Sequence, residues 1–215
     1  MKKILFIATI IGIVLASCKK DKDDDPVVVS MVTKAPEVLI GLAGAGNTLI
    51  DWGDGTKEKN NISGEWLSYT YDYSDAATSH TITITGKMIT GMDCNSNQLT
   101  SLDVSKNTKM TFLNCSENQL TSLDVSTNTT LTSLSCHNNQ LTSLDVSRNT
   151  ALRWLYCYNN LLDADALDYL FGTLNSIYGE KFIYIGGNGP NYDGSGTYNC
   201  DKSIAEDKGW IVKNR

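Results

Sequence analysis

Residues 89–162 repeat one pattern four times and read ITGMDCNSNQLTSLDVSKNTK (89–109), MTFLNCSENQLTSLDVSTNTT (110–130), LTSLSCHNNQLTSLDVSRNTA (131–151) and LRWLYCYNNLL (152–162). The same residue types return every 21 positions, and they are Cys94, Cys115, Cys136 and Cys157, then Asn97, Asn118, Asn139 and Asn160, then Met92, Leu113, Leu134 and Leu155. A fixed period of this length indicates structural units that stack on one another and share one core.

Each repeat contains a short strand followed by a returning segment. Leu134 and Cys136 alternate with polar residues, which is the two-residue period of a strand with one buried face. The asparagine that follows can bond backbone groups of its own turn and of the next one, because its amide offers both donors and acceptors. In the returning segment, Leu144 and Val146 are expected to point inward. The pattern L-x-x-L-x-C-x-x-N-x-L resembles the leucine-rich repeat family, and the resemblance implies a short solenoid of 21-residue repeats.

The repeated cysteines predict a ladder of buried free thiols. Neighbouring strands are about 4.8 Å apart, so the two ends of the row lie about 14 Å apart. Zinc requires all its ligands at about 2.3 Å from one point, which such a row cannot provide. We therefore expect neither a metal nor a cofactor, and Cys200 is expected to be another free thiol. The repeated Asp103, Asp124 and Asp145 are interpreted as structural, because identical residues at identical repeat positions serve the repeat itself.

The first 26 residues predict export and attachment to a membrane. Residues 1–17 combine two lysines with an apolar run that is too short to span a bilayer, as in a signal peptide. Residues 15–18, Leu-Ala-Ser-Cys, resemble a bacterial lipobox, which implies lipidation of Cys18; an ordinary cleaved signal is the alternative. Residues 18–26 are charged and predict a flexible tether. The acidic stretch resembles the export tag of Bacteroides-type surface lipoproteins, which implies an outer-membrane, cell-surface location. Calcium binding by the tether stays an open alternative.

Residues 27–87 predict a small β-sandwich. Short strands are expected at 27–32, 37–42, 48–51, 66–71 and 80–85, separated by turn-forming clusters that include a glycine-rich turn at 41–46. Trp52-Gly53-Asp54-Gly55, followed by Tyr69-x-Tyr71, resembles a PKD-type domain, an immunoglobulin-like module of extracellular proteins. Asp54-Gly55 fits a tight hairpin turn. This module is also expected to cover the apolar end of the first repeat.

Residues 88–215 are predicted to form the leucine-rich repeat domain with a helical C-terminal cap. Asp163 can cap a helix whose apolar residues follow at helical spacing. Residues 183–188 restore the strand and the asparagine of a fifth repeat. The final segment, residues 200–210, predicts a short helix and a closing strand. The fold class is thus mainly β with some α.

The outward strand positions are the candidate binding surface, because they vary while the inward ones do not. Aromatic residues gather there, and exposed aromatic patches usually mark binding sites. The candidate ligand-binding residues are Phe112, His137, Trp154, Tyr156, Tyr158, Phe182 and Tyr184. The alternative is that the tail, residues 192–215, folds over these rings and makes them part of the core.

Composition argues against two classes of function, nucleic-acid binding and catalysis. The net charge of −6 and the lack of a basic run after residue 22 argue against nucleic acid as a partner. With two histidines and no assignable catalytic arrangement, the sequence predicts no enzyme. We expect a monomeric surface lipoprotein that binds a protein or glycoprotein. A glycan-binding accessory lipoprotein of a polysaccharide uptake system is the alternative.

Overall fold

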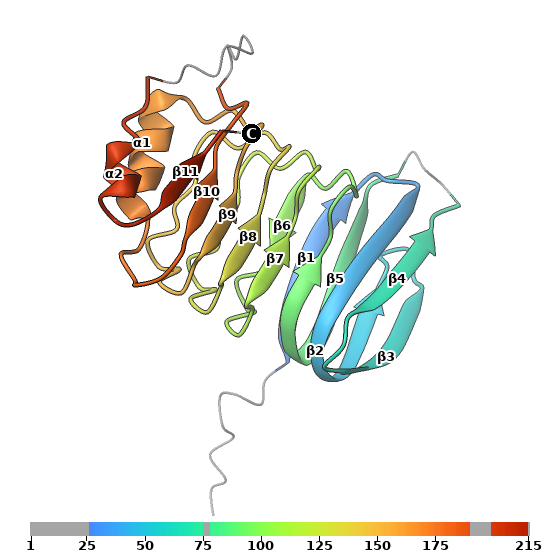
Figure 1. Ribbon diagram of the computed structural model, residues 1–215. Helices are drawn as coiled ribbons and strands as arrows, with labels where there is room; N and C mark the ends of the chain where they lie inside the picture. The colour runs from blue at the N-terminus through green and yellow to red at the C-terminus, as the bar shows by residue number, and fades with distance from the viewer. Residues whose placement is uncertain (1–25, 75–77, 190–198, 215) are drawn as a thin grey trace, which may run out of the picture.

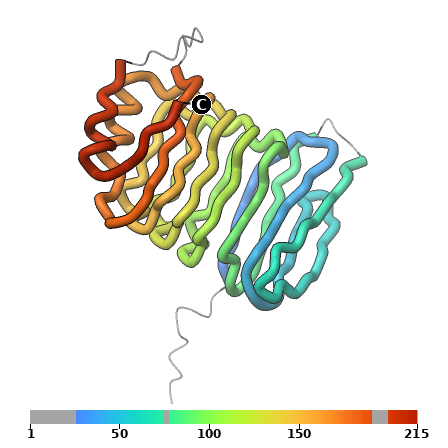
Figure 2. Tube along the Cα trace, in the orientation of Figure 1, coloured from blue at the N-terminus to red at the C-terminus, as the bar shows by residue number. Residues whose placement is uncertain are grey.

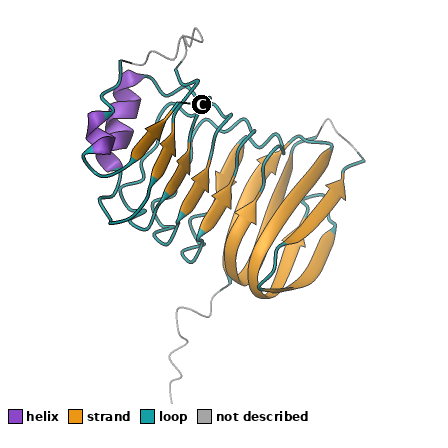
Figure 3. Cartoon of the chain, viewed as in Figure 1, coloured by secondary structure: helices purple, strands orange, loops and turns teal. Residues whose placement is uncertain are grey.

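The computed structural model describes residues 26–74, 78–189 and 199–214, and these are mainly β-structure with little helix (Figures 1 and 3). The strands are β1 (Val27–Thr33), β2 (Glu37–Asp51), β3 (Lys57–Ser63), β4 (Leu67–Asp72), β5 (His80–Asp93), β6 (Ser101–Asp103), β7 (Phe112–Asn114), β8 (Ser133–Ser135), β9 (Trp154–Tyr156), β10 (Phe182–Tyr184) and β11 (Ile211–Lys213). The helices are α1 (Ala164–Thr173) and α2 (Ser203–Glu206). All described strands join one sheet.

The repeats form stacked coils, as the Cα trace shows (Figure 2). β5, β7, β8, β9, β10 and β11 follow one another as parallel neighbours. Their central residues are paired in register, and the apolar row continues beyond the four repeats through Ile183 and Val212. The period of 21 residues therefore equals one turn of the coil, and equivalent side chains lie directly beside one another. The stacking expected from the repeat pattern is confirmed.

A row of buried asparagines ties neighbouring coils together. The Nδ2 group of Asn139 donates to the carbonyls of Cys115 at 3.0 Å and Cys136 at 3.1 Å, and its Oδ1 accepts from the N–H of Leu120 at 3.0 Å. Asn118 and Asn160 make the equivalent bonds. Each side chain thus satisfies backbone groups of two coils at once. The role inferred for these asparagines from the sequence is confirmed.

The cysteine ladder is buried and free of disulfides. Cys94, Cys115, Cys136 and Cys157 have no exposed surface, and all the cysteines that the structure describes are free thiols. Burial raises the pKa of Cys157 to about 12 and raises the pKa values of the other three thiols well above their ordinary value. A raised thiol pKa disfavours the thiolate, which is the reactive form. The prediction of buried thiols acting as apolar fillers is confirmed.

We expect these four thiols to resist alkylation in the folded protein. Incubation with iodoacetamide at pH 8 should leave peptides containing Cys94, Cys115, Cys136 and Cys157 unmodified, because neither reagent nor hydroxide reaches them without an opening of the coils. The same peptides should be fully modified in guanidinium chloride. Mass spectrometry of the digested protein measures both states. Rapid modification of any of the four in native buffer would contradict the buried ladder.

The returning segments form the opposite side of the coils and present repeated acidic turns. Leu144 and Val146 are buried, as expected. Oδ1 of Asp124 accepts from the N–H of Ser126 at 2.8 Å, and Asp103 and Asp145 make the same turn with the serines that follow them. Hydrogen bonds from these serines lower the pKa values of all three aspartates. Their structural interpretation is confirmed.

A second asparagine row, not predicted from the sequence, lies under these turns. Asn107, Asn128 and Asn149 are buried, and the Nδ2 group of Asn128 donates to the carbonyls of Val104 at 3.0 Å and Asn107 at 2.8 Å. Asn149 makes the same pair of bonds one coil further on. The coils are therefore fastened along both sides.

Two long strands connect the N-terminal segment to the coils. β5 pairs with β1 through residues 80–86 and with β7 through residues 91–93, so it belongs to both regions. The expected boundary between residues 87 and 88 falls inside this strand. β2 lies beside β5 over most of its length, and the buried apolar residues of both regions form one cluster. Residues 27–87 thus extend the coil sheet and cover its first turn.

The glycine-rich turn predicted at 41–46 is wrong, because β2 runs through it. Two register shifts against β5, after Ala43 and after Ala45, bend the strand there. Gly44 has a φ of 149°, and a Cβ on it would lie 2.0 Å from the carbonyl oxygen of Met88. Glycine is needed at this position for a close approach of two backbones. β3, whose only buried residue is Ile62, was missed because its polar sequence lacks an apolar alternation.

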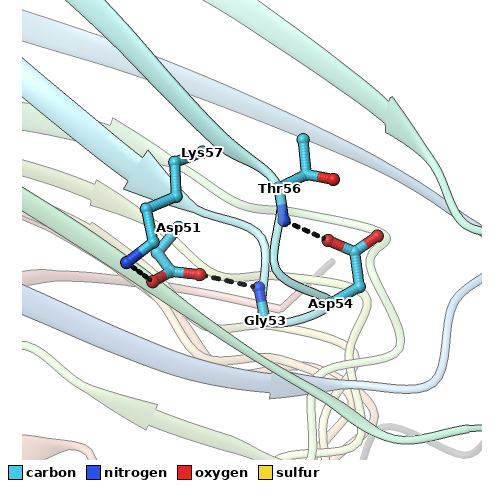
Figure 4. A network of polar contacts seen from close by, with 5 residues as sticks. All are labelled: Asp51, Gly53, Asp54, Thr56 and Lys57. Carbon is cyan, nitrogen blue, oxygen red and sulfur yellow. Dashed lines mark hydrogen bonds and ion pairs between the residues drawn. The ribbon is translucent and has the colours of Figure 1, made fainter.

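The predicted turn at Asp54-Gly55 is confirmed and connects β2 to β3 (Figure 4). Asp51 accepts from the N–H of Gly53 at 3.1 Å and pairs with Lys57 at 2.7 Å. Asp54 accepts from the N–H of Thr56 at 2.8 Å and from the hydroxyl of Tyr71 at 2.6 Å. These contacts lower the pKa values of both carboxyl groups, with Lys57 and Tyr71 as the main causes. The acidic residues of this turn therefore shape the loop.

At the other end, two helices and β11 complete the described part of the chain. Oδ1 of Asp163 accepts from the N–H of Ala166 at 2.9 Å, so it caps α1 as predicted. The helix buries Leu167, Leu170 and Phe171. β11 adds to the sheet beside β10, and α2 contacts α1 (Figure 1).

The predicted signal peptide (1–17), Cys18 and the tether up to residue 25 lie outside the described residues. Among the residues that are described, none of the helices has the length and the apolar character that a membrane span needs.

Candidate binding face

The outward side chains of the parallel strands form the face that we term the front face. Register pairing defines its two columns. The first column runs Gly91, Phe112, Ser133, Trp154, Phe182 and Ile211, and the second runs Asp93, Asn114, Ser135, Tyr156, Tyr184 and Lys213. Small serines in the middle separate aromatic residues on either side.

The aromatic residues of β9 and β10 form one cluster. The side chain of Trp154 is 40% exposed, which is high for a tryptophan at the centre of a sheet face. The rings of Tyr156 and Tyr184 are stacked with centroids 4.6 Å apart and an interplanar angle of 10°. Phe182 is half-buried beside Trp154. Because the rings support one another on rigid strands, little side-chain freedom remains to be lost on binding.

His137 and Tyr158 form a second stacked pair at the edge of this cluster. Their ring centroids are 4.2 Å apart and their planes differ by 8°. Tyr158 is only 8% exposed, so the open side chain expected from the sequence is not found. Tyr158 is thus a buried member of the face, and His137 is the more accessible partner of the stack.

Phe112 lies on the other side of the serines and has a partner that sequence reasoning missed. Trp66 precedes β4, and its ring contacts Phe112 edge to face, with centroids 5.3 Å apart and planes at 82°. The indole is 48% exposed. A Cβ on Gly91 would lie 2.8 Å from this ring, so the tryptophan occupies the space that the glycine leaves open. The glycine at an outward strand position was the signal that could have revealed it.

The described part of the C-terminal tail does not cover these rings. β11 lies at the edge of the sheet, and α2 contacts α1. Residues 190–198 lie outside the described residues, so the alternative of a covering tail is tested only for residues 199–214. In that part of the tail, residues 211–213 extend the sheet at its edge and α2 lies against α1.

The front face offers flat aromatic surfaces and hydrogen-bond acceptors. Within residues 26–74, 78–189 and 199–214, no three His, Cys, Asp or Glu side chains come together as metal ligands would. Oδ1 of Asp93 accepts from the amide side chain of Asn95 at 2.6 Å, and Oδ2 accepts from that of Asn114 at 3.2 Å. The face can therefore stack on flat or apolar groups and accept hydrogen bonds, which suits recognition.

Fold and face together define a β-rich solenoid with an aromatic surface on one side. No protein-family profile matches the chain, and no curated protein matches it either. Among solved structures, it is similar to the functional domain of InlJ from Listeria monocytogenes, which is described as including a cysteine ladder. That similarity has 23% identity and a TM-score of 0.36, and it covers 62% of this chain and 42% of the other. The chain therefore spans less than half the length of that structure.

Proposed function

We propose that the chain is a leucine-rich repeat lipoprotein of the cell surface that binds a protein or glycoprotein through its front face. The observation that carries this proposal is the exposed Trp154, flanked in its column by Phe182 and followed by the exposed Ile211. Tryptophan and tyrosine are enriched among the residues that dominate binding energy at protein interfaces. A rigid sheet presents them without a cost of ordering a loop.

The remaining parts of the proposal follow from the sequence. The lipobox at residues 15–18 supports anchoring of a monomer through Cys18 in the outer membrane, and the acidic tether supports exposure at the cell surface. The Trp52–Gly55 turn and Tyr71 support a PKD-like origin for residues 27–87, which serve as the N-terminal cover of the solenoid. Neither catalysis nor nucleic-acid binding is part of the proposed function.

Substitution of the exposed ring tests this function. The full chain in detergent micelles is applied to a panel of immobilised extracellular proteins and glycoproteins, each also in deglycosylated form. We expect Trp154→Ala to weaken binding to the recognised panel member by about 30-fold, as for a residue at the centre of an interface. Tyr156→Ala should act in the same direction.

The matched control is Tyr169→Ala on α1, which removes a ring that is 57% exposed away from the front face. This variant should bind like the parent chain. Unchanged binding by Trp154→Ala would contradict the proposal. So would a large fall in melting temperature in that variant, because it would make the ring part of the fold.

A glycan-binding accessory role is the second candidate, favoured by the separate ring pair of Trp66 and Phe112. Loss of binding to the deglycosylated panel members would support it over recognition of a polypeptide surface.

A further inference from the structure

A hollow of about 370 Å³ lies where the N-terminal segment meets the first coils. It is lined by Trp66, Thr90, Gly91, Asp93, Thr111 and Phe112. Sites for small molecules in proteins typically measure about 300–1,000 Å³, so this hollow has room for a single small ring. It contains two aromatic side chains, one carboxylate and two threonines, and its lining includes no cationic side chain.

The two rings form a corner rather than a flat patch. Trp66 and Phe112 are nearly perpendicular, and the indole lies against the backbone of Gly91. Gly41 on β2 lies on the same side of the ring, where a Cβ would be in ordinary contact with the indole at 3.4 Å. The tryptophan is thus held in position by backbone on one side while 48% of its surface stays open to solvent. A ring fixed in this way loses little freedom when a ligand stacks on it.

Polar groups stand beside the aromatic corner and can accept hydrogen bonds. The carboxylate of Asp93 is oriented by the side-chain amides of Asn95 and Asn114, and an ionised carboxylate has about four acceptor sites, so capacity remains. The hydroxyl of Thr111 donates to the carbonyl of Thr90 at 3.0 Å and keeps its own lone pairs. The hollow is therefore apolar on one side and rich in acceptors on the other.

From this arrangement we infer that the hollow is a subsite for one neutral sugar ring of a glycan. A sugar ring has an apolar C–H face that stacks on an aromatic ring, and hydroxyl groups around its edge that donate to carboxylates. An acidic sugar is disfavoured, because its carboxylate would meet Asp93 in a hollow whose lining includes no lysine, arginine or histidine. The inference deepens the proposed function and rests on the front face being a binding surface, but it uses a different pair of rings.

Titration with defined oligosaccharides tests the subsite. The full chain in detergent micelles is titrated with neutral β-glucan, α-mannan and β-galactan hexamers and with an oligogalacturonate, followed by calorimetry and tryptophan fluorescence. At least one neutral hexamer should bind, and the oligogalacturonate should not. Trp66→Ala should weaken that binding by about tenfold or more, and Trp66→Phe should restore part of it.

Two further variants separate loss of the site from loss of the fold. Gly91→Ala adds one methyl group that displaces the indole, and it should weaken binding as Trp66→Ala does while the circular dichroism spectrum stays unchanged. Tyr169→Ala on α1, which removes an exposed ring away from the front face, should bind the neutral hexamer within about twofold of the parent.

The inference is overturned if none of the neutral hexamers binds, if only the oligogalacturonate binds, or if Trp66→Ala binds as the parent does. Equal losses in Trp66→Ala and Tyr169→Ala would also overturn it, because the loss would then not depend on the ring that lines the hollow. Failure of the proposed function gives a different result: the protein panel shows no dependence on Trp154, whatever the oligosaccharides do.

Discussion

Replacing Asn139 by alanine is expected to lower the free energy of unfolding by about 4 kcal/mol. The side chain is the middle one in the row of Asn118, Asn139 and Asn160. It bonds three carbonyls, those of Cys115, Cys136 and His137, and the N–H of Leu120, on two adjacent coils. Alanine leaves the carbonyls of Cys115 and Cys136 and the N–H of Leu120 buried without these partners. The carbonyls of Cys115 and Cys136 keep Asn118 and Asn160 as donors. The loss is therefore that of the four hydrogen bonds of Asn139, at about 1 kcal/mol each, which accounts for the size of the effect.

Urea denaturation followed by circular dichroism measures this loss. Gln140→Ala is the matched control, because residue 140 is adjacent in the chain and its side chain is exposed. The backbone bond from the N–H of Gln140 to the carbonyl of Leu120 at 2.9 Å is kept in that variant, so its stability should change by less than about 0.5 kcal/mol. If Asn139→Ala lowered the free energy of unfolding by less than about 1.5 kcal/mol, the asparagine row would contribute little to the stability of the stacked coils.

Asn128→Ala is expected to cost about 3 kcal/mol, whereas the same substitution at Asn107 should be nearly neutral. Both side chains are fully buried at the same repeat position. Asn128 donates to the carbonyls of Val104 and Asn107, but neither Nδ2 nor Oδ1 of Asn107 has a hydrogen-bond partner in the part of the chain that the structure describes. The coil that would precede Asn107 is absent, because β1 runs antiparallel beside β6 in its place.

Asn107 and Asn128 occupy the same position in successive repeats. A difference in stability between the two variants therefore reports the hydrogen bonds of the side chain and not its place in the repeat. Equilibrium unfolding of both variants in urea gives the comparison. Equal losses at the two positions would contradict the assignment of the cost to the two bonds of Asn128. A gain in stability in Asn107→Ala agrees with it, because removing a buried amide without partners removes its desolvation cost.

The repeats show how far sequence reasoning reaches in this protein. A period of two along each repeated strand and of 21 between these strands decides which side of the strand is buried. The cysteine ladder and the row of Asn118, Asn139 and Asn160 were therefore predicted correctly. The second asparagine row was missed, although Asn107, Asn128 and Asn149 keep the same spacing. Its burial depends on how the returning segment turns, and no alternation of apolar residues marks that turn.

The residues of the candidate site that lie on the repeated strands were predicted, and those outside the repeats were missed. Trp154 and Tyr156 lie on a repeat whose register is set by the period of 21, and Phe182 and Tyr184 lie on the strand that restores the repeat pattern 28 residues further on. The structure places all four together on one face. Trp66 lies outside the repeats, and its contact with Phe112 joins residues 46 positions apart in the chain. Tyr158 is buried and stacks on His137 of the preceding coil, which the pattern of a single strand does not show.

By itself, the sequence determined the coil, its period, the buried and exposed sides of each repeated strand and the helix capped by Asp163. Periodicity carries this information because each side chain's direction follows from its neighbours along the chain. Only the tertiary structure decided that β2 continues through its glycines, that β5 belongs to two regions and that Trp66 reaches the front face. Those outcomes depend on pairings between strands distant in sequence, and their register is chosen by the packing of the whole core.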